Sequence, residues 1–196
     1  FFTAYDDNDR TQLWRSDGTI SGTYMFTNIH PDEFSIEFEA FEAVGNTLFF
    51  ATWNDDLWVS DGTESGTQNI TPEGSTLSGD YLTAAGDTLF FINSGELWVS
   101  NGTAESTIPV DSGRSVNYLS SYFDLMAFGD QLLFNPDGQL WISDGTKSGT
   151  YPLKDFASSQ SSASIHQMVS GNGLAYLNVT INNRPALWQT DGTPSG

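Results

Sequence analysis

The sequence predicts an all-β protein made of about five copies of one four-stranded antiparallel unit. Two observations lead to this prediction. A seven-residue string, Leu-Trp-x-x-Asp-Gly-Thr with Asn for Asp in the third copy, recurs at 13–19, 57–63, 97–103, 140–146 and 187–193. Between the copies lie short aromatic and β-branched runs separated by Gly, Asn and Asp, a pattern typical of β-hairpins.

The tryptophan of the string sets the length of the repeat. Five of the six tryptophans occupy this position, and they lie 40 to 47 residues apart. That interval is typical of the blades of a β-propeller. These residues, here called the repeat tryptophans, are Trp14, Trp58, Trp98, Trp141 and Trp188.

The third unit shows the predicted strands in order. A first strand over 81–85 ends in a Gly-Asp turn, and a strongly β-prone second strand follows over 88–92. A tight turn leads to a third strand over 96–100, which carries the repeat tryptophan, and 107–110 forms a fourth strand. The turn between first and second strands is predicted at Gly-Asn or Gly-Asp pairs, which stand at 45–46, 86–87, 129–130 and 171–172.

The architecture follows from the apolar pattern of these strands. The second and third strands are almost continuously apolar, as expected for a sheet that neighbours cover on both faces. We therefore predict a β-propeller of four-stranded antiparallel blades; a solenoid of stacked hairpins is the competing architecture, although its repeats are usually shorter. Because 1–196 starts inside a second strand and stops before a fourth, we expect one segment of a larger or incomplete propeller. Its predicted parts are a partial blade at 1–33, blades at about 34–75, 76–113 and 114–157, and a partial blade at 158–196.

The Asp-Gly-Thr part of the string predicts a turn. The Asp side chain can accept backbone N–H bonds two residues on, and Gly can adopt the positive φ that such a turn requires. The turn residues are Asp17, Asp61, Asn101, Asp144 and Asp191. A second glycine follows five residues later and is expected to redirect the chain into the fourth strand; Ser106 replaces it in the third copy, so that turn must differ or be strained. Calcium binding is the alternative, but each loop offers one carboxylate where calcium takes six to eight oxygens.

Composition excludes several classes of function. The chain has 25 acidic and 6 basic residues and a net charge of −19, so it repels nucleic acid and anionic membranes. It has no cysteine, which excludes disulfides, thiolate metal sites and cysteine nucleophiles. No apolar run approaches the length that spans a membrane.

The repeated strings resemble those of a bacterial repeat family named for its Glu-Leu-Trp-x-x-Asp-Gly-Thr signature. The resemblance covers essentially the whole chain, although the leading Glu is kept only at Glu96. The family occurs in large, acidic, secreted or surface-attached proteins, so the resemblance implies a propeller-like domain that is extracellular or at the cell surface. It carries over no catalytic residue and no ligand.

Candidate ligand-binding residues lie in the variable connections. In a four-stranded blade, the second-to-third turns and the links between blades share one end, and here they vary in sequence. Variable loops on a rigid scaffold usually carry binding. The candidates are Trp53, Asp55, Asp56, Arg114 and Tyr122. For Trp53 the alternative is burial at the strand end.

Carboxylates at Asp6, Asp7 and Asp9 form the densest acidic cluster and are the candidate site for calcium, the one cofactor that the sequence suggests. The cluster lacks the Gly and the terminal Glu of an EF-hand, and a solvated acidic loop is the alternative.

The predicted function is a non-catalytic binding or scaffolding module of a secreted or cell-surface protein. It would contact a partner protein, a larger assembly or a glycan through the variable loop face. The alternative is a propeller enzyme that acts on a polysaccharide, which would need an inward-facing cluster of Asp, Glu, His or Arg from several blades. The sequence shows only scattered charges in its loops, which favours the binding module.

Overall fold

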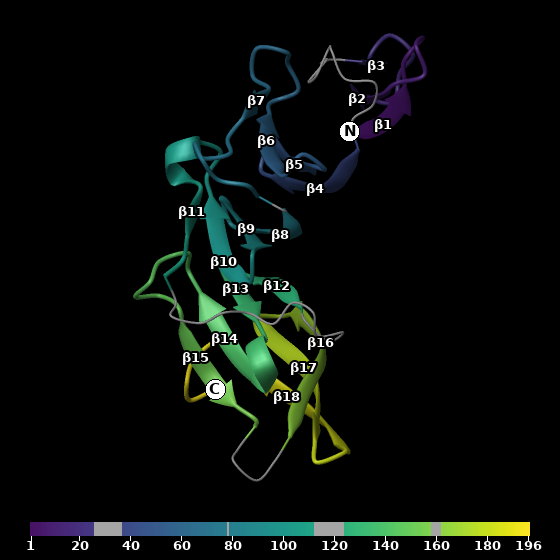
Figure 1. Cartoon of the computed structure of the whole chain (residues 1–196). Coiled ribbons are helices and arrows are strands. Elements are labelled where there is room, and N and C mark those ends of the chain that lie inside the picture. The colour runs from purple at the N-terminus through teal and green to yellow at the C-terminus, as the bar shows by residue number, and fades with distance from the viewer. Residues whose placement is uncertain (26–36, 78, 112–123, 158–161) are drawn as a thin grey trace.

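The computed structural model describes residues 1–25, 37–77, 79–111, 124–157 and 162–196 (Figure 1). All regular structure in these residues is β-strand, apart from two single-turn 3-10 helices at Ala104–Ser106 and Pro136–Gly138. The prediction of an all-β chain is therefore confirmed. The part of the chain that the structure describes contains no helix long and apolar enough to cross a membrane.

The strands form five antiparallel sheets, numbered 1 to 5 along the chain, and neighbours in sequence are neighbours in each sheet. Sheet 1 contains β1 (Phe2–Tyr5), β2 (Thr11–Arg15) and β3 (Tyr24–Met25). Sheet 2 contains β4 (Phe38–Val44), β5 (Thr47–Thr52), β6 (Asp56–Ser60) and β7 (Gln68–Asn69). Sheet 3 contains β8 (Asp80–Ala85), β9 (Thr88–Asn93), β10 (Glu96–Ser100) and β11 (Ile108–Pro109). Sheet 4 contains β12 (Leu125–Phe128), β13 (Gln131–Phe134), β14 (Gln139–Ser143) and β15 (Tyr151–Asp155), and sheet 5 contains β16 (Ala163–Gly171), β17 (Leu174–Ile181) and β18 (Arg184–Thr190).

Each repeat tryptophan lies on the strand that the sequence predicts. In the three four-stranded sheets this is the third strand, which is β6, β10 or β14. The indole pairs across the sheet with an aromatic side chain of the second strand, and the ring centroids of Trp58 and Phe50 are 6.2 Å apart. Such cross-strand aromatic pairs stabilise a sheet beyond simple burial.

The five sheets follow one another in a curved row (Figure 1). The first strands of successive sheets contact each other, so β4 lies against β8, β8 against β12 and β12 against β16. The outer strands β7, β11 and β15 lie along the opposite edge of the row (Figure 1). The first strands of neighbouring sheets are in contact along one edge of the row, so the row curves around these strands. The described residues form an open row and not a closed ring.

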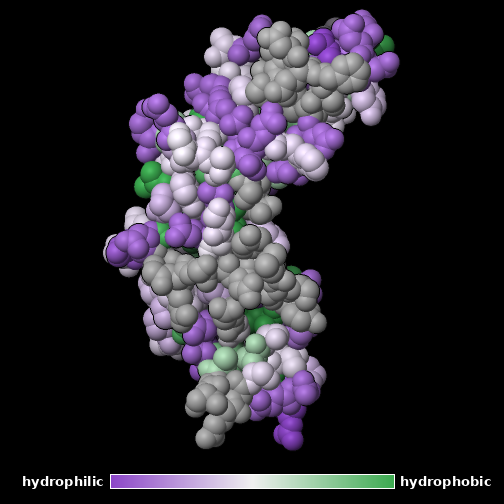
Figure 2. All heavy atoms as spheres, in the orientation of Figure 1, coloured by the Kyte–Doolittle hydropathy of each residue, from purple (hydrophilic) through white to green (hydrophobic). Residues whose placement is uncertain are grey.

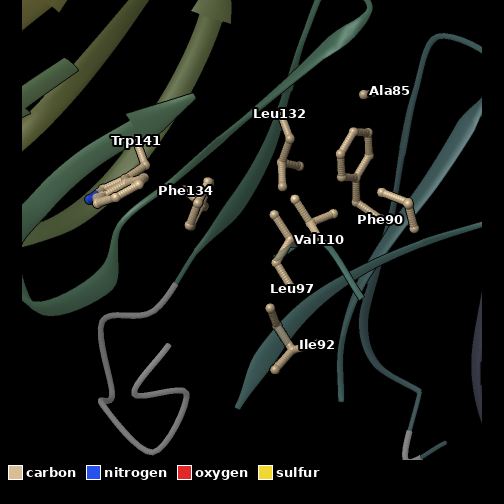
Figure 3. Packing of buried hydrophobic residues seen from close by; sticks show 9 residues of the cluster. Ala85, Phe90, Ile92, Leu97, Val110, Leu132, Phe134 and Trp141 are labelled. Carbon is tan, nitrogen blue, oxygen red and sulfur yellow. The ribbon is translucent and has the colours of Figure 1, made fainter. Parts of the chain in front are cut away.

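The apolar core lies between the sheets. Between sheets 3 and 4, Phe90, Leu97 and Val110 lie near Leu132, and Phe134 and Trp141 of sheet 4 belong to the same buried cluster (Figure 3). Similar buried clusters fill the other interfaces. In sheets 2 to 4 the second and third strands are largely buried because each face meets a different neighbour, which explains their continuous apolar pattern.

A repeated glycine contact joins successive sheets. A Cβ added to the glycine of the Asp-Gly-Thr string would contact the residue that follows the repeat tryptophan of the preceding sheet. It would lie 3.7 Å from Val59 Cγ2 at Gly102 and 3.4 Å from Val99 Cγ1 at Gly145. The remaining pairs are Ile142 with Gly192, and Arg15 with Gly62, whose carbonyl oxygen accepts from Arg15 Nη1 at 2.9 Å.

One predicted turn is displaced by a residue. Three first-to-second turns begin with a glycine of positive φ, as the sequence predicts, at Gly45, Gly86 and Gly129. In sheet 5 Gly171 pairs with Leu174 inside the ladder, so the turn is Asn172-Gly173 and not 171–172. Both turn residues have positive φ, 56° and 76°, which is the Asn-Gly geometry of a type I′ hairpin.

Candidate functional site

The Asp-Gly-Thr loops are closed by their own hydrogen bonds. Asp61 Oδ1 accepts from Thr63 N at 2.9 Å and from Thr63 Oγ1 at 2.7 Å, and Thr63 Oγ1 accepts from Gly66 N at 3.0 Å. The same two bonds to the aspartate recur in the other Asp-containing copies. The threonine hydroxyl, followed by its backbone N–H, holds the pKa of each of these carboxyls below its usual range. We call Asp17, Asp61, Asp144 and Asp191 the turn carboxylates; each accepts the backbone N–H two residues on, as the sequence predicts.

The second glycine of the loop leaves space for the side chain of the turn carboxylate. Gly66 lies in the turn just before the fourth strand, β7, as the sequence predicts, but it does not have a positive φ. A Cβ at Gly66 would lie 2.1 Å from Asp61 Oδ1, so glycine is needed there for space. In the third copy a serine stands in place of this glycine. Its hydroxyl, Ser106 Oγ, accepts the backbone N–H of Asn101 at 3.2 Å and of Thr103 at 3.3 Å. That turn differs, as predicted, and Ser106 is not strained.

The β5–β6 turn presents the most exposed tryptophan among the residues described. The side chain of Trp53 is 67% exposed, so the alternative that it is buried is wrong. Its backbone is held firmly, since Trp53 N donates to Glu37 O at 3.0 Å. Asp55 is exposed beside it, and its carbonyl oxygen accepts from Leu77 N at 2.7 Å. The turn is therefore tied to the chain on both sides while its indole faces solvent.

Asp56 has a structural position rather than an exposed one. Its Oδ1 accepts from Thr71 Oγ1 at 3.3 Å, and that hydroxyl accepts from Leu57 N at 2.9 Å. The carboxylate thus joins the start of β6 to the link that follows β7. Of the five predicted ligand-binding residues, Trp53 and Asp55 lie together on the surface, whereas Arg114 and Tyr122 lie outside the described residues.

In the acidic cluster near the N-terminus, Asp6 is paired with Arg10. Asp6 accepts from the N–H of Asn8 at 2.8 Å and of Arg10 at 2.9 Å, and its Oδ2 lies 3.1 Å from Arg10 Nη2. The Arg10 backbone N–H is the main cause of the lowered pKa of Asp6. Asp7 and Asp9 are exposed. In residues 1–25 and the other described segments, no three His, Asp or Glu side chains are placed to bind one metal ion.

Two carboxylates join neighbouring sheets along the first strands, and sequence analysis did not identify either. Glu42 Oε1 accepts from Ala84 N at 3.0 Å, which links β4 to β8. Asp124 Oδ2 accepts from Met168 N at 3.3 Å, which links the start of β12 to β16. Asp124 is half-buried, and burial raises the pKa of its carboxyl. Both bonds join residues more than 40 positions apart, so no local sequence signal could reveal them.

A hollow of about 380 Å³ lies beside the outer edge of sheet 5. It is bordered by Leu140 and Leu153 of sheet 4 and by Trp188, whose ring meets Phe156 edge-on at 5.1 Å. Lys154 Nζ lies 5.7 Å from the Trp188 ring centroid. Elsewhere the face shown in Figure 2 is mainly hydrophilic over the described residues, with small separate hydrophobic spots.

Solved structures share this fold at low sequence identity. Human WBSCR16 is 10% identical with a TM-score of 0.56, and the match covers 94% of this chain and 60% of that chain. The computationally designed Ika8 protein is 16% identical with a TM-score of 0.53, over 98% of this chain and 61% of the designed one. The designed Ika4 protein is 14% identical with a TM-score of 0.52, over 84% of this chain and 97% of that chain. This chain therefore spans about three fifths of the length of WBSCR16 and Ika8. No protein-family model and no curated protein sequence matches the chain.

Proposed function

We propose that the chain is a segment of a β-propeller and acts as a non-catalytic binding or scaffolding module of a secreted or cell-surface protein. Its support is the arrangement of the sheets: first strands contact one another across successive sheets, and sheets 2 to 4 each pack apolar side chains against a neighbour on both faces. Blades around an axis have this arrangement. The acidic composition and the resemblance of the repeated strings support an extracellular place.

The binding face is proposed at the end that carries the second-to-third turns, and the observation that carries this proposal is Trp53. Its indole is exposed, whereas hydrogen bonds on both sides fix its backbone. An exposed ring on an ordered turn offers a large contact area while little conformational entropy is lost on binding. Asp55 beside it adds a carboxylate that can accept hydrogen bonds from a sugar hydroxyl or a peptide N–H.

The test is a glycan array probed with the unmodified chain, Trp53→Ala and the control Ile108→Ala. Ile108 is a 49% exposed apolar side chain on the outer strand β11, away from the proposed face. We expect binding to neutral oligosaccharides that Trp53→Ala weakens at least about tenfold, about 1.4 kcal/mol, and that Ile108→Ala leaves unchanged. Binding that survives Trp53→Ala would refute the proposed face.

The enzyme alternative rests on Asp124. It is a carboxyl with raised pKa on the first-strand edge, which a propeller directs towards its axis. If the chain hydrolyses a polysaccharide, Asp124→Asn should abolish turnover while Trp53→Ala changes KM. The same oligosaccharides, incubated with the chain and analysed by chromatography, decide between cleavage and binding.

A further inference from the structure

A second aromatic ring is exposed at the position in the fold that Trp53 occupies. In sheets 1 and 2 the repeat tryptophan pairs with a phenylalanine of the strand before it, and the residue three positions after that phenylalanine is Tyr5 or Trp53. Tyr5 is 72% exposed and Trp53 is 67% exposed. The corresponding residues of sheets 3, 4 and 5 are Ser94, Asp137 and Thr180, so aromatic rings at this position are confined to two neighbouring sheets.

The exposure of Tyr5 is a property of its turn and not of an uncovered sheet face. Side chains alternate along a strand, so Tyr5 is on the same face of β1 as Thr3, which pairs with the buried Leu13. Leu13 packs with Leu48 in the cluster between sheets 1 and 2, so this face has a neighbour. Sheet 2 has four strands and a neighbour on each face, and its Trp53 is exposed to a similar extent.

Hydrogen bonds hold both turns in place. After Tyr5, the N–H of Asp6 donates to Arg10 O at 2.8 Å, and the Asp6 side chain forms an ion pair with Arg10. In the other turn, Trp53 N donates to Glu37 O at 3.0 Å. Sheets that pack face to face stand about 10 Å apart, and sheets 1 and 2 share a buried cluster. The two rings are therefore presented about one sheet spacing apart, at the end of the sheets that carries the second-to-third turns.

We propose that Tyr5 and Trp53 together bind one linear, neutral glycan chain, with each ring stacked on the flat C–H face of a different sugar unit. The inference rests on the proposed binding face and adds a second contact to it. A single sugar unit cannot reach both rings across the sheet spacing, so the ligand is a chain of several units. Two contacts with one chain strengthen binding, because the second contact forms at a high effective concentration once the first is made.

The polar groups around the two rings favour a carbohydrate over a protein partner. Asp7, Asp9 and Asp55 are exposed in the same two turns, and carboxylates accept hydrogen bonds from sugar hydroxyls. The core of a protein–protein interface is, by contrast, depleted of charged side chains. These carboxylates repel an acidic glycan, and the Arg10 side chain is already paired with Asp6. The ligand that fits both turns is therefore a neutral chain.

The test measures how affinity depends on the length of the sugar chain. Linear cello-, manno- and xylo-oligosaccharides of two and of six units are titrated into the unmodified chain and its variants by calorimetry, with a six-unit oligogalacturonate as the acidic comparison. Tyr5→Ala removes the second ring, Tyr5→Phe removes only its hydroxyl, and Trp53→Ala removes the first ring. Tyr151→Ala is the matched control, because Tyr151 is a 36% exposed tyrosine on the outer strand β15.

We expect at least one neutral six-unit chain to bind the unmodified protein at least about tenfold more tightly than its two-unit counterpart. Tyr5→Ala should remove this advantage and leave the affinity for the two-unit chain unchanged, whereas Trp53→Ala should weaken binding of both lengths. Tyr5→Phe and Tyr151→Ala should keep the advantage, since each retains both rings.

The outcomes separate the two-ring site from the proposed binding face. If Trp53→Ala weakens binding but Tyr5→Ala does not, the face stands and the two-ring site is refuted. If Trp53→Ala has no effect on binding, the face itself is refuted. The two-ring site is also overturned if none of the neutral linear chains binds, or if the oligogalacturonate binds as tightly as they do.

Discussion

Replacing Gly149 by alanine tests why the second glycine of the loop is required. A Cβ at this position would lie 2.0 Å from Asp144 Oδ1, far inside van der Waals contact. Asp144 must then leave its place and lose its hydrogen bonds from Thr146 N at 2.8 Å and Thr146 Oγ1 at 2.7 Å. At about 0.5–1.5 kcal/mol for each bond, and towards the lower end because the loop is exposed, the expected loss of stability is about 1–2 kcal/mol.

The measurement is urea unfolding followed by tryptophan fluorescence, with thermal unfolding as a second observable. For a chain of this length, each kcal/mol corresponds to a fall in Tm of about 2–4 °C. Gly171→Ala is the matched control, because a Cβ there meets nothing within 4 Å and the backbone does not have a positive φ. We expect that control to be neutral or slightly stabilising, since alanine restricts the unfolded chain.

A paired substitution completes the experiment. Asp144→Asn with Gly149→Ser reproduces the pair found in the third copy, where Ser106 Oγ accepts the backbone N–H bonds instead of a carboxylate. The pair should therefore be more stable than the sum of its two single substitutions predicts, as a double-mutant cycle would show. The steric explanation fails if Gly149→Ala costs no more than Gly171→Ala, or if the paired substitution shows no coupling.

Three further predictions concern the loops and the repeat tryptophans. Gly192→Ala should lower the free energy of unfolding by about 1–3 kcal/mol more than Gly18→Ala, as measured by urea unfolding. Both glycines have positive φ, but only a Cβ at Gly192 would lie 2.8 Å from a ring carbon of Phe128 in the preceding sheet. The turn carboxylates have a folded pKa below their unfolded value of 3.8, so their stabilisation is present above that pH and is lost as pH falls through the lower folded pKa. Urea midpoints between about pH 6 and about pH 3 should show this fall, and a flat profile would contradict it. Trp141→Phe should lower the free energy of unfolding by at least about 1 kcal/mol more than Trp98→Phe. Trp141 Nε1 donates to Gln139 Oε1 at 2.9 Å, whereas Trp98 Nε1 is buried without an acceptor in the described residues. Equal Tm shifts for the two variants would disprove this.

Local chemistry made most strands predictable. The run predicted at 88–92 forms β9, because its aromatic and branched residues favour a pleated strand and a Gly-Asp turn precedes it. The turn before Leu174 was predicted one residue too early, because 172–173 suits a hairpin as well as 171–172 does. Only the pairing of Gly171 with Leu174 decides between them, and that depends on the whole β16–β17 ladder.

The candidate site could be predicted only in part. Variation in the second-to-third turns identified Trp53, but the sequence could not show whether its ring is exposed, since that depends on the path of distant segments. The inter-sheet bond of Glu42 to Ala84 N depends on the spacing of two first strands, which the sequence does not encode locally. The sequence does not reveal Arg10 as the partner of Asp6, because this ion pair forms only when the β1–β2 turn closes.

The unequal cores between the sheets have a consequence for how the chain opens. Among the described residues, the hydrophobic cluster between sheets 1 and 2 contains three buried side chains, Leu13, Leu48 and Phe50. Each of the clusters at the two interfaces that flank sheet 4 contains nine. In a protein whose units touch only their neighbours, local opening starts where the coupling between units is weakest. Amide hydrogens of β1 and β2 should therefore exchange with solvent before those of β13 and β14, so that the molecule loses its order from one end inwards.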